Sequence, residues 1–215
     1  DSTSRQLLTG DAEGRCWLWN ADDGRASELA TGHSKSVSAV YFLPDLPWTR
    51  QRGLLAVTAA DDGQVRVWNR ELQSRADGRL DVAAPIDASC LSADGRQFVC
   101  AASTGDATTG LWWWDVSEAR VLARQELVGE SVNSMEFARS GEGQVLVTTT
   151  DLKSSQQDVK VWTLAAADAP PRTYAMASSG RRTWEGAVWH ATESPDGKHL
   201  ITAGGKSARL WNLDD

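Results

Sequence analysis

The chain contains few of the residues on which several protein classes depend. Three cysteines, Cys16, Cys90 and Cys100, are too few for a disulfide scaffold, and no Cys-x-x-Cys pair offers a zinc site. Apolar runs such as residues 53–60 are strand-sized and fall well short of the ~20 residues of a membrane helix. The first residues show no apolar stretch of a signal peptide. We therefore expect a cytoplasmic protein, and because the chain does not begin with Met, we expect its native start upstream.

Residue patterns typical of catalysis or metal binding are also missing from the sequence. The three histidines, His33, His190 and His199, lack the spacing of metal ligands. No Gly-x-Ser-x-Gly elbow and no phosphate-binding glycine loop occurs. The net charge of −7 argues against a nucleic-acid groove. The sequence therefore predicts a protein without catalytic residues, cofactor or metal, which binds neither nucleic acid nor a membrane.

Tryptophan, by contrast, is abundant, with 11 residues against three Phe and two Tyr. Five tryptophans close similar apolar segments: Trp19, Trp68, Trp114, Trp162 and Trp211. Successive members of this set are 49, 46, 48 and 49 residues apart. Four nearly equal intervals indicate a tandem structural repeat, in which each unit is anchored by one indole.

Each unit contains the same succession of short alternating runs and turns. Residues 37–42 and 97–101 alternate or run apolar, and turns such as 92–95 separate them. This pattern predicts short β-strands, and no segment shows helical periodicity. Four strands in each unit of about 48 residues predict an all-β fold, a β-propeller of four-stranded antiparallel blades. We expect one propeller region over 1–215, with blades at approximately 1–31, 32–84, 85–128, 129–178 and 179–215.

The second unit carries the most detailed motif. It contains Gly32-His33, the alternating run 37–42, the turn Asp61-Asp62-Gly63 and the pair Trp68-Asn69. These residues resemble the WD-repeat family, and the resemblance covers essentially the whole chain. The Trp-Asp ending of that family occurs literally at Trp114-Asp115, whereas Asn or Thr follows the other anchors. The resemblance implies a propeller that presents loops to a protein partner.

The resemblance also implies a buried hydrogen-bonded tetrad in the second unit, formed by His33, Thr58, Asp62 and Trp68. The aspartate would accept from the imidazole, which would meet the threonine hydroxyl and then the indole N–H. Asp61 could take the place of Asp62. No other unit has the Gly-His pair, so we expect the remaining blades to rely on apolar packing.

The phase of the repeat predicts incomplete blades at both ends of the sequence. Residues 5–10 and 15–20 correspond to the second and third strands of a blade, whereas 187–193, 198–203 and 207–213 correspond to the first three. The prediction is 18 strands, distributed 3, 4, 4, 4 and 3. Three interpretations stay open: part of a longer, seven-bladed propeller, an unusual five-bladed ring, or completion by dimerisation or strand exchange.

Two long segments, 150–158 and 177–186, would lie on one face of a WD-repeat propeller. They contain Lys153 and the group Arg181, Arg182 and Trp184. A tryptophan flanked by arginines is typical of an interface anchor, so these residues are candidate contacts for a partner. Alternatively, Trp184 begins the next inner strand and packs inward.

An insertion at 44–53 carries another tryptophan outside the anchor set, Trp48, close to Arg50 and Arg52. Trp48 is a candidate contact on the opposite face, and the alternative is that it folds over its own blade.

Two kinds of position depart from the repeat. The residues two before each anchor are Trp17, Arg66, Trp112, Lys160 and Arg209. Arg and Lys fit a partly exposed outer strand, and we expect Trp17 and Trp112 to pack.

Glu193 stands where the other units have Phe42, Leu91 and Phe137. A carboxylate at an apolar position needs a partner or a shifted pKa, which predicts either a channel-facing site or a slipped register that leaves Glu193 in solvent.

We interpret the chain as a non-catalytic scaffold for protein binding. One alternative is a fragment whose open blades assemble with another propeller piece or a second copy. Another alternative is a propeller enzyme or sugar-binding module with an acidic site that includes Glu193. The resemblance and the 17 Arg against five Lys favour a bacterial signalling protein.

Overall fold

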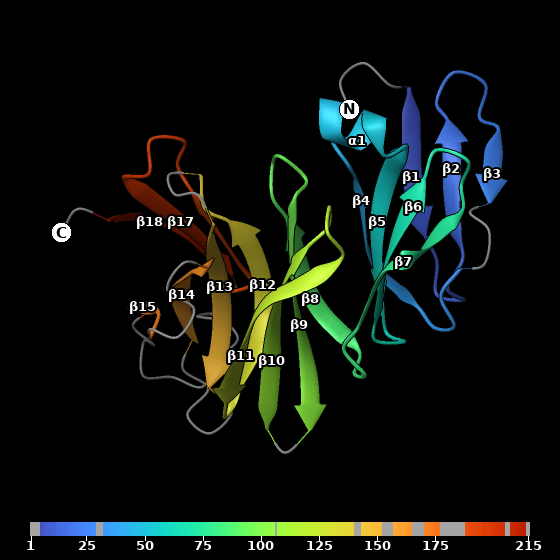
Figure 1. Ribbon diagram of the computed structural model, residues 1–215. Helices are drawn as coiled ribbons and strands as arrows, with labels where there is room; N and C mark the ends of the chain where they lie inside the picture. Colours follow the sequence, from blue (N-terminus) through green and yellow to red (C-terminus); the bar gives the residue numbers. More distant parts are fainter. Residues whose placement is uncertain are drawn as a thin grey trace.

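The computed structural model describes residues 5–28, 32–105, 107–139, 143–151, 157–164, 170–176, 188–204 and 207–213. Within these residues the protein forms five antiparallel sheets and one short helix (Figure 1). The described sheets contain 3, 4, 4, 4 and 3 strands. The all-β prediction and the distribution of strands are therefore confirmed.

We number the sheets in chain order. Sheet 1 holds β1 (Gln6–Gly10), β2 (Cys16–Asn20) and β3 (Ala26–Glu28). Sheet 2 holds β4 (Val37–Phe42), β5 (Leu54–Ala60), β6 (Gln64–Asn69) and β7 (Ser74–Asp81). Sheet 3 holds β8 (Ile86–Leu91), β9 (Gln97–Gly105), β10 (Thr108–Asp115) and β11 (Arg120–Val128). Sheet 4 holds β12 (Glu130–Phe137), β13 (Gln144–Asp151), β14 (Gln157–Thr163) and β15 (Arg172–Met176). Sheet 5 holds β16 (His190–Glu193), β17 (His199–Gly204) and β18 (Ser207–Asn212).

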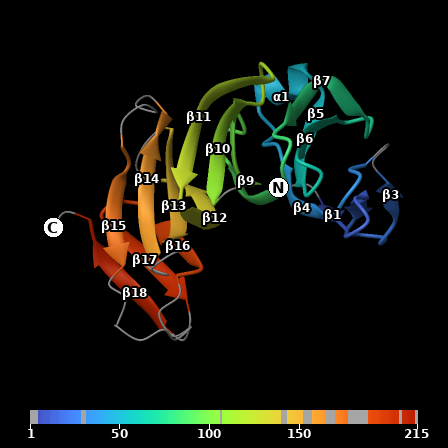
Figure 2. The same ribbon diagram turned by 90° about the horizontal axis from the view of Figure 1, so that it is seen from below.

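The first strands of successive sheets contact one another, so the sheets follow the order of the chain. β1 contacts β4, β4 contacts β8, β8 contacts β12, and β12 contacts β16. Both views place sheet 1 at one end of the arrangement and sheet 5 at the other (Figures 1 and 2). The five described sheets thus form an open row and do not close on one another as a five-bladed ring.

The three consecutive tryptophans of β10 show how strand alternation fills the spaces between sheets. Trp112 and Trp114 join the buried cluster that sheet 3 shares with sheet 2. Trp113, which points to the opposite face, joins the cluster shared with sheet 4 and lies 6.3 Å from the ring of Trp162. Since successive strand residues face opposite ways, one short segment supplies indoles to both interfaces.

The five anchor tryptophans occupy the same position in the repeat. Where a sheet precedes the anchor's own sheet, the anchor packs in the buried cluster between the two sheets. Trp68 lies between sheets 1 and 2, Trp114 between sheets 2 and 3, and Trp162 between sheets 3 and 4. These three are 0, 1 and 5% exposed. Trp19 is half-buried, because the described chain places no sheet before sheet 1.

The insertion at 44–53 contains a helix, α1 (Pro47–Gln51), which the sequence analysis missed. Pro47 fits the first turn of a helix, where its missing N–H costs no hydrogen bond. Thr49 is fully buried, and its hydroxyl donates to the carbonyl oxygens of Pro44 and Leu46. Five residues are too few for helical periodicity to appear in the sequence.

Cys90 and Cys100 lie on paired strands and point to opposite faces of sheet 3. Both are buried free thiols. Among the described residues, no helix is long and apolar enough to cross a membrane.

Candidate functional site

The structure brings His33, Thr58, Asp62 and Trp68 together in a hydrogen-bonded chain. Nδ1 of His33 lies 3.1 Å from Oδ1 of Asp62, and Nε2 lies 2.7 Å from Oγ1 of Thr58. Nε1 of Trp68 donates to the same Thr58 oxygen over 2.9 Å. The threonine hydroxyl accepts from the indole and donates to the imidazole, which assigns the His33 proton to Nδ1. The carboxylate in this chain of bonds is that of Asp62, not that of the alternative, Asp61.

Burial and hydrogen bonds set the charges of this group. Burial lowers the pKa of His33, and the neighbouring Asp62 carboxylate opposes that shift only in part. Burial also acts to raise the pKa of Asp62, but backbone N–H bonds from Ser34 and Gln64 and the contact with His33 leave it below its usual value. The group therefore pairs a neutral imidazole with a carboxylate, and the two side chains are 0 and 4% exposed, which is typical of a structural network.

The other anchors repeat part of this arrangement. Trp19 Nε1 donates to Thr9 Oγ1 over 2.8 Å, and Trp211 Nε1 donates to Thr202 Oγ1 over 3.0 Å. In each case the threonine pairs, on the neighbouring strand, with the residue two positions before the anchor: Thr9 with Trp17 and Thr202 with Arg209. The sequence analysis missed these two threonines, although a threonine nine or ten residues before the anchor was a signal that could have identified them.

Sheets 3 and 4 replace this threonine. Register places Cys100 opposite Trp112 in sheet 3 and Val147 opposite Lys160 in sheet 4. Valine has no acceptor, and Trp162 Nε1 is buried without a hydrogen-bond partner among the described residues. Apolar packing alone thus holds the fourth anchor, in agreement with its tilted contact with Trp113.

The candidate partner contacts divide into two groups. Lys153, Arg181, Arg182 and Trp184 lie outside the described residues. Trp48 is half-buried against sheet 3: its Nε1 donates to the carbonyl oxygen of Asp94 over 3.2 Å, and the Arg96 guanidinium lies 5.5 Å from its ring. These contacts lie on the following sheet, whereas the folded-over alternative placed Trp48 on its own blade.

The positions two before each anchor differ in their surroundings. Trp112 is 7% exposed and lies under the Arg124 guanidinium at 5.1 Å, whereas Trp17 is half-buried. Lys160 Nζ lies 2.5 Å from both carboxylate oxygens of Glu130. Arg66 donates to Gln64 Oε1, and Arg209 is exposed.

Glu193 is 8% exposed and faces sheet 4, so the structure departs from both expectations for this residue. Its Oε2 accepts the backbone N–H of Arg139 over 2.8 Å. The register of β16 is regular, with Glu193 opposite Leu200, so no slip exposes the side chain. A carboxylate can be buried here because it is hydrogen-bonded to the backbone of the preceding sheet.

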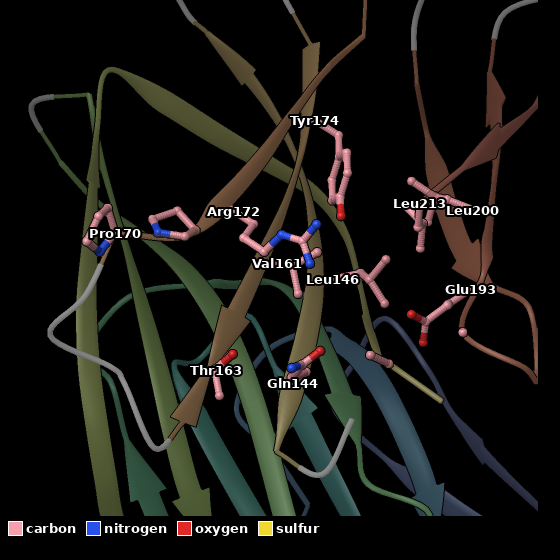
Figure 3. Close-up of a pocket in the computed structure, with 13 residues that line it drawn as sticks. Gln144, Leu146, Val161, Thr163, Pro170, Arg172, Tyr174, Glu193, Leu200 and Leu213 are labelled. Atoms are coloured by element: carbon pink, nitrogen blue, oxygen red, sulfur yellow. The ribbon is translucent and has the colours of Figure 1, made fainter. Parts of the chain in front are cut away.

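A cavity of about 230 Å³ lies beside Glu193, between sheets 4 and 5 (Figure 3). Its lining combines apolar and polar side chains: Ala138, Gln144, Leu146, Val161, Thr163, Pro170, Pro171, Arg172, Tyr174, Glu193, Gly197, Leu200 and Leu213. Glu193 is the one carboxylate in this lining, so the described residues around this cavity offer no pair of acids for glycoside hydrolysis. Among the same described residues, no group of three His, Cys, Asp or Glu side chains could hold a metal ion.

Comparison with known proteins adds sequence likeness to this geometry. Residues 26–69 and 178–212 match the family model described as WD domain, G-beta repeat. The chain is 27% identical over 215 residues to pre-mRNA-processing factor 19 homolog 2 of Arabidopsis thaliana, covering 96% of this chain and 36% of that protein. It is 25% identical over 206 residues to apoptotic protease-activating factor 1 of Homo sapiens, covering 94% of this chain and 14% of that protein. The chain therefore spans well under half the length of these two relatives. Two of its segments match the WD repeat, and its five antiparallel sheets are consistent with the blades of a WD-repeat propeller.

Proposed function

We propose that this chain is a non-catalytic platform that presents loops at the ends of its sheets to a protein partner. WD-repeat domains generally bind proteins, and the similarity to that family supports the proposal. The buried clusters between sheets are made of similar residues, so the connections between strands are the parts that can give each sheet a different contact.

The observation that carries the proposal is the meeting of two connections at Gln157. The first connection joins β13 to β14, and Gln157 is the first residue of β14. The second joins β15 to β16, and Gln157 pairs with Met176, the last residue of β15. Its side-chain oxygen also accepts the backbone N–H of Val188, which precedes β16. Both connections thus start or end around one residue, which supports a shared surface that includes Lys153, Arg181, Arg182 and Trp184.

A double variant, Arg182→Ala/Trp184→Ala, tests this surface. The immobilised wild-type chain would be used to capture proteins from a lysate of the source cells, with the double variant and Arg120→Ala in parallel. Arg120 is exposed in sheet 3, so its variant controls for loss of surface charge. We expect one specific protein to be retained by the wild type and the control and lost by the double variant. Equal recovery by all three would show that this surface does not bind the partner. Recovery by the wild type no better than by empty resin would contradict the proposed function.

Assembly with another sheet is a second candidate function, favoured by apolar side chains on the two end sheets. Ile201 and Leu210 pair across β17 and β18 and are 44 and 67% exposed. Leu7 on β1 is 58% exposed. Sedimentation equilibrium of the wild type and of Leu210→Ser would test it, since a monomer at all concentrations contradicts self-association. A bacterial origin and a signalling role stay predictions.

A further inference from the structure

The cavity between sheets 4 and 5 corresponds to a space that is filled between sheets 2 and 3. The two spaces adjoin equivalent turns, Ser92–Arg96 and Ser194–Lys198. In both turns the serine hydroxyl donates to the aspartate Oδ1, which also accepts the backbone N–H two residues on. The glycine that follows the aspartate, Gly95 in one turn and Gly197 in the other, has φ of 70° and 71° respectively. The backbones of the two turns therefore match, and the residues around them can be compared position by position.

The residues around the two spaces can be compared through the strand registers. Leu43 follows β4 as Ala138 follows β12, and Phe98 faces Trp114 as Leu200 faces Trp211. Leu54 and Gln144 both face the residue after the anchor. Each replacement near sheet 5 is smaller or more polar, and Glu193 stands in place of Leu91. These exchanges leave the volume of about 230 Å³ next to sheet 5.

The space between sheets 2 and 3 also receives an aromatic ring from outside the strands. Trp48 of α1 packs against this cluster, donates its N–H to the Asp94 carbonyl over 3.2 Å and lies beneath Arg96 at 5.5 Å. The corresponding residues of the second turn are Asp196, which has the same carbonyl, and Lys198, which has the same charge. The described part of sheet 4 holds no helix after β12 to supply such a ring.

We propose that the cavity between sheets 4 and 5 binds one tryptophan side chain from a segment of the protein partner. This proposal rests on the proposed function. The volume exceeds the ~150 Å³ of a cavity that accepts benzene and is below the ~300 Å³ at which small-molecule pockets begin. It therefore suits a single large side chain. Buried aromatic anchors in such pockets dominate the energetics of many protein interfaces.

The walls of the cavity match an indole in both polarity and charge. Both sheets supply apolar side chains to the ring, Leu146 and Val161 from sheet 4 and Leu200 from sheet 5 (Figure 3). The Glu193 carboxylate on one wall can accept from an indole N–H, since a carboxylate accommodates about four acceptor contacts. Arg172 on β15 of sheet 4 lies 5.5 Å from the Tyr174 ring and is exposed, so it places a cation at the cavity where it can face the ring of the ligand.

A titration followed by amide NMR shifts tests the proposal on the whole chain. The probe is N-acetyl-tryptophan amide, with N-acetyl-leucine amide and N-acetyl-lysine amide as comparators. We expect saturable shifts at Gly197 and Glu193 with the tryptophan probe in the millimolar range, and at least fivefold weaker binding of the other two. Ala138→Leu copies Leu43 and fills the cavity, so it should weaken tryptophan binding at least tenfold.

Two further variants keep this test decisive. Gln144→Leu copies Leu54 and fills the cavity from a second position, in case Ala138→Leu does not fold. Ala208→Leu adds the same atoms at an exposed site on β18, outside the lining, and should leave binding unchanged. No saturable shift in the wild type, equal affinity for the leucine probe, or unchanged affinity in both filled variants would overturn the proposal. If the chain captures a partner but does not bind the tryptophan probe, the proposal for the cavity is overturned and the proposed function is not.

Discussion

Replacing Thr58 by valine removes one hydroxyl that serves two buried hydrogen bonds. Thr58 is fully buried, and valine has nearly the same volume, so the change opens no cavity. It leaves Trp68 Nε1 without its acceptor and His33 Nε2 without its donor. Both atoms would then be buried polar groups with no partner in their surroundings.

The magnitude follows from the cost of unsatisfied groups. Each buried donor or acceptor left without a partner costs about 1–3 kcal/mol. With two such groups, and some relaxation around His33, we expect the free energy of unfolding to fall by about 2–4 kcal/mol. The reverse change, Val147→Thr, offers an acceptor to Trp162 Nε1 at the corresponding position of sheet 4. It should raise the free energy of unfolding by about 0.5–1 kcal/mol.

Urea unfolding monitored by circular dichroism would measure both variants against the wild type. The pair is a matched control, because the same two side chains are exchanged in opposite directions at equivalent sites. A loss below about 0.5 kcal/mol for Thr58→Val would refute the account, since a net hydrogen bond alone contributes about that much. Destabilisation by both variants would contradict the expected gain from an acceptor for Trp162 Nε1.

Three other predictions concern protonation, backbone geometry and thiol reactivity. Burial lowers the pKa of His33, so as pH falls the imidazole is protonated in the unfolded chain before it is protonated in the folded one. The free energy of unfolding should therefore fall as pH drops below about 6.5. Urea titrations at pH 8, 6 and 5 should show a smaller fall for His33→Gln. Gly95→Ala should cost at least about 1 kcal/mol and lower the thermal midpoint, because φ is 70° and the added Cβ would lie 2.5 Å from Cδ of Pro44. Burial raises the pKa of Cys100 to about 12, so Ellman's reagent should label this thiol only after unfolding; rapid labelling at pH 8 would contradict its burial.

Most of the fold could be predicted because each unit repeats one pattern of strands and turns. The alternation around Trp68 and its counterparts identifies the strands, and the phase of the repeat accounts for three strands in the first and last sheets. Helix α1 could not be predicted, because its stability depends on the buried Thr49 and on contacts of Trp48 with the next sheet. Such contacts are not encoded in a five-residue window.

The candidate site was less accessible from the sequence. The unusual position of Glu193 could be seen, but its partner could not, because the N–H of Arg139 lies 54 positions earlier and meets it only when sheets 4 and 5 pack. The cavity depends on several small differences from the interface of sheets 2 and 3, such as Ala138 for Leu43. Each difference looks ordinary in its own unit.

Hydrogen exchange of the tryptophan indole N–H groups, resolved by NMR, tests the central claim that one indole per unit is held in the interior between sheets. The account predicts slow exchange for Trp68, Trp114 and Trp162, which are at most 5% exposed, and fast exchange for Trp189, which is 52% exposed. Similar rates for all four indoles would contradict the stacked, repeated architecture.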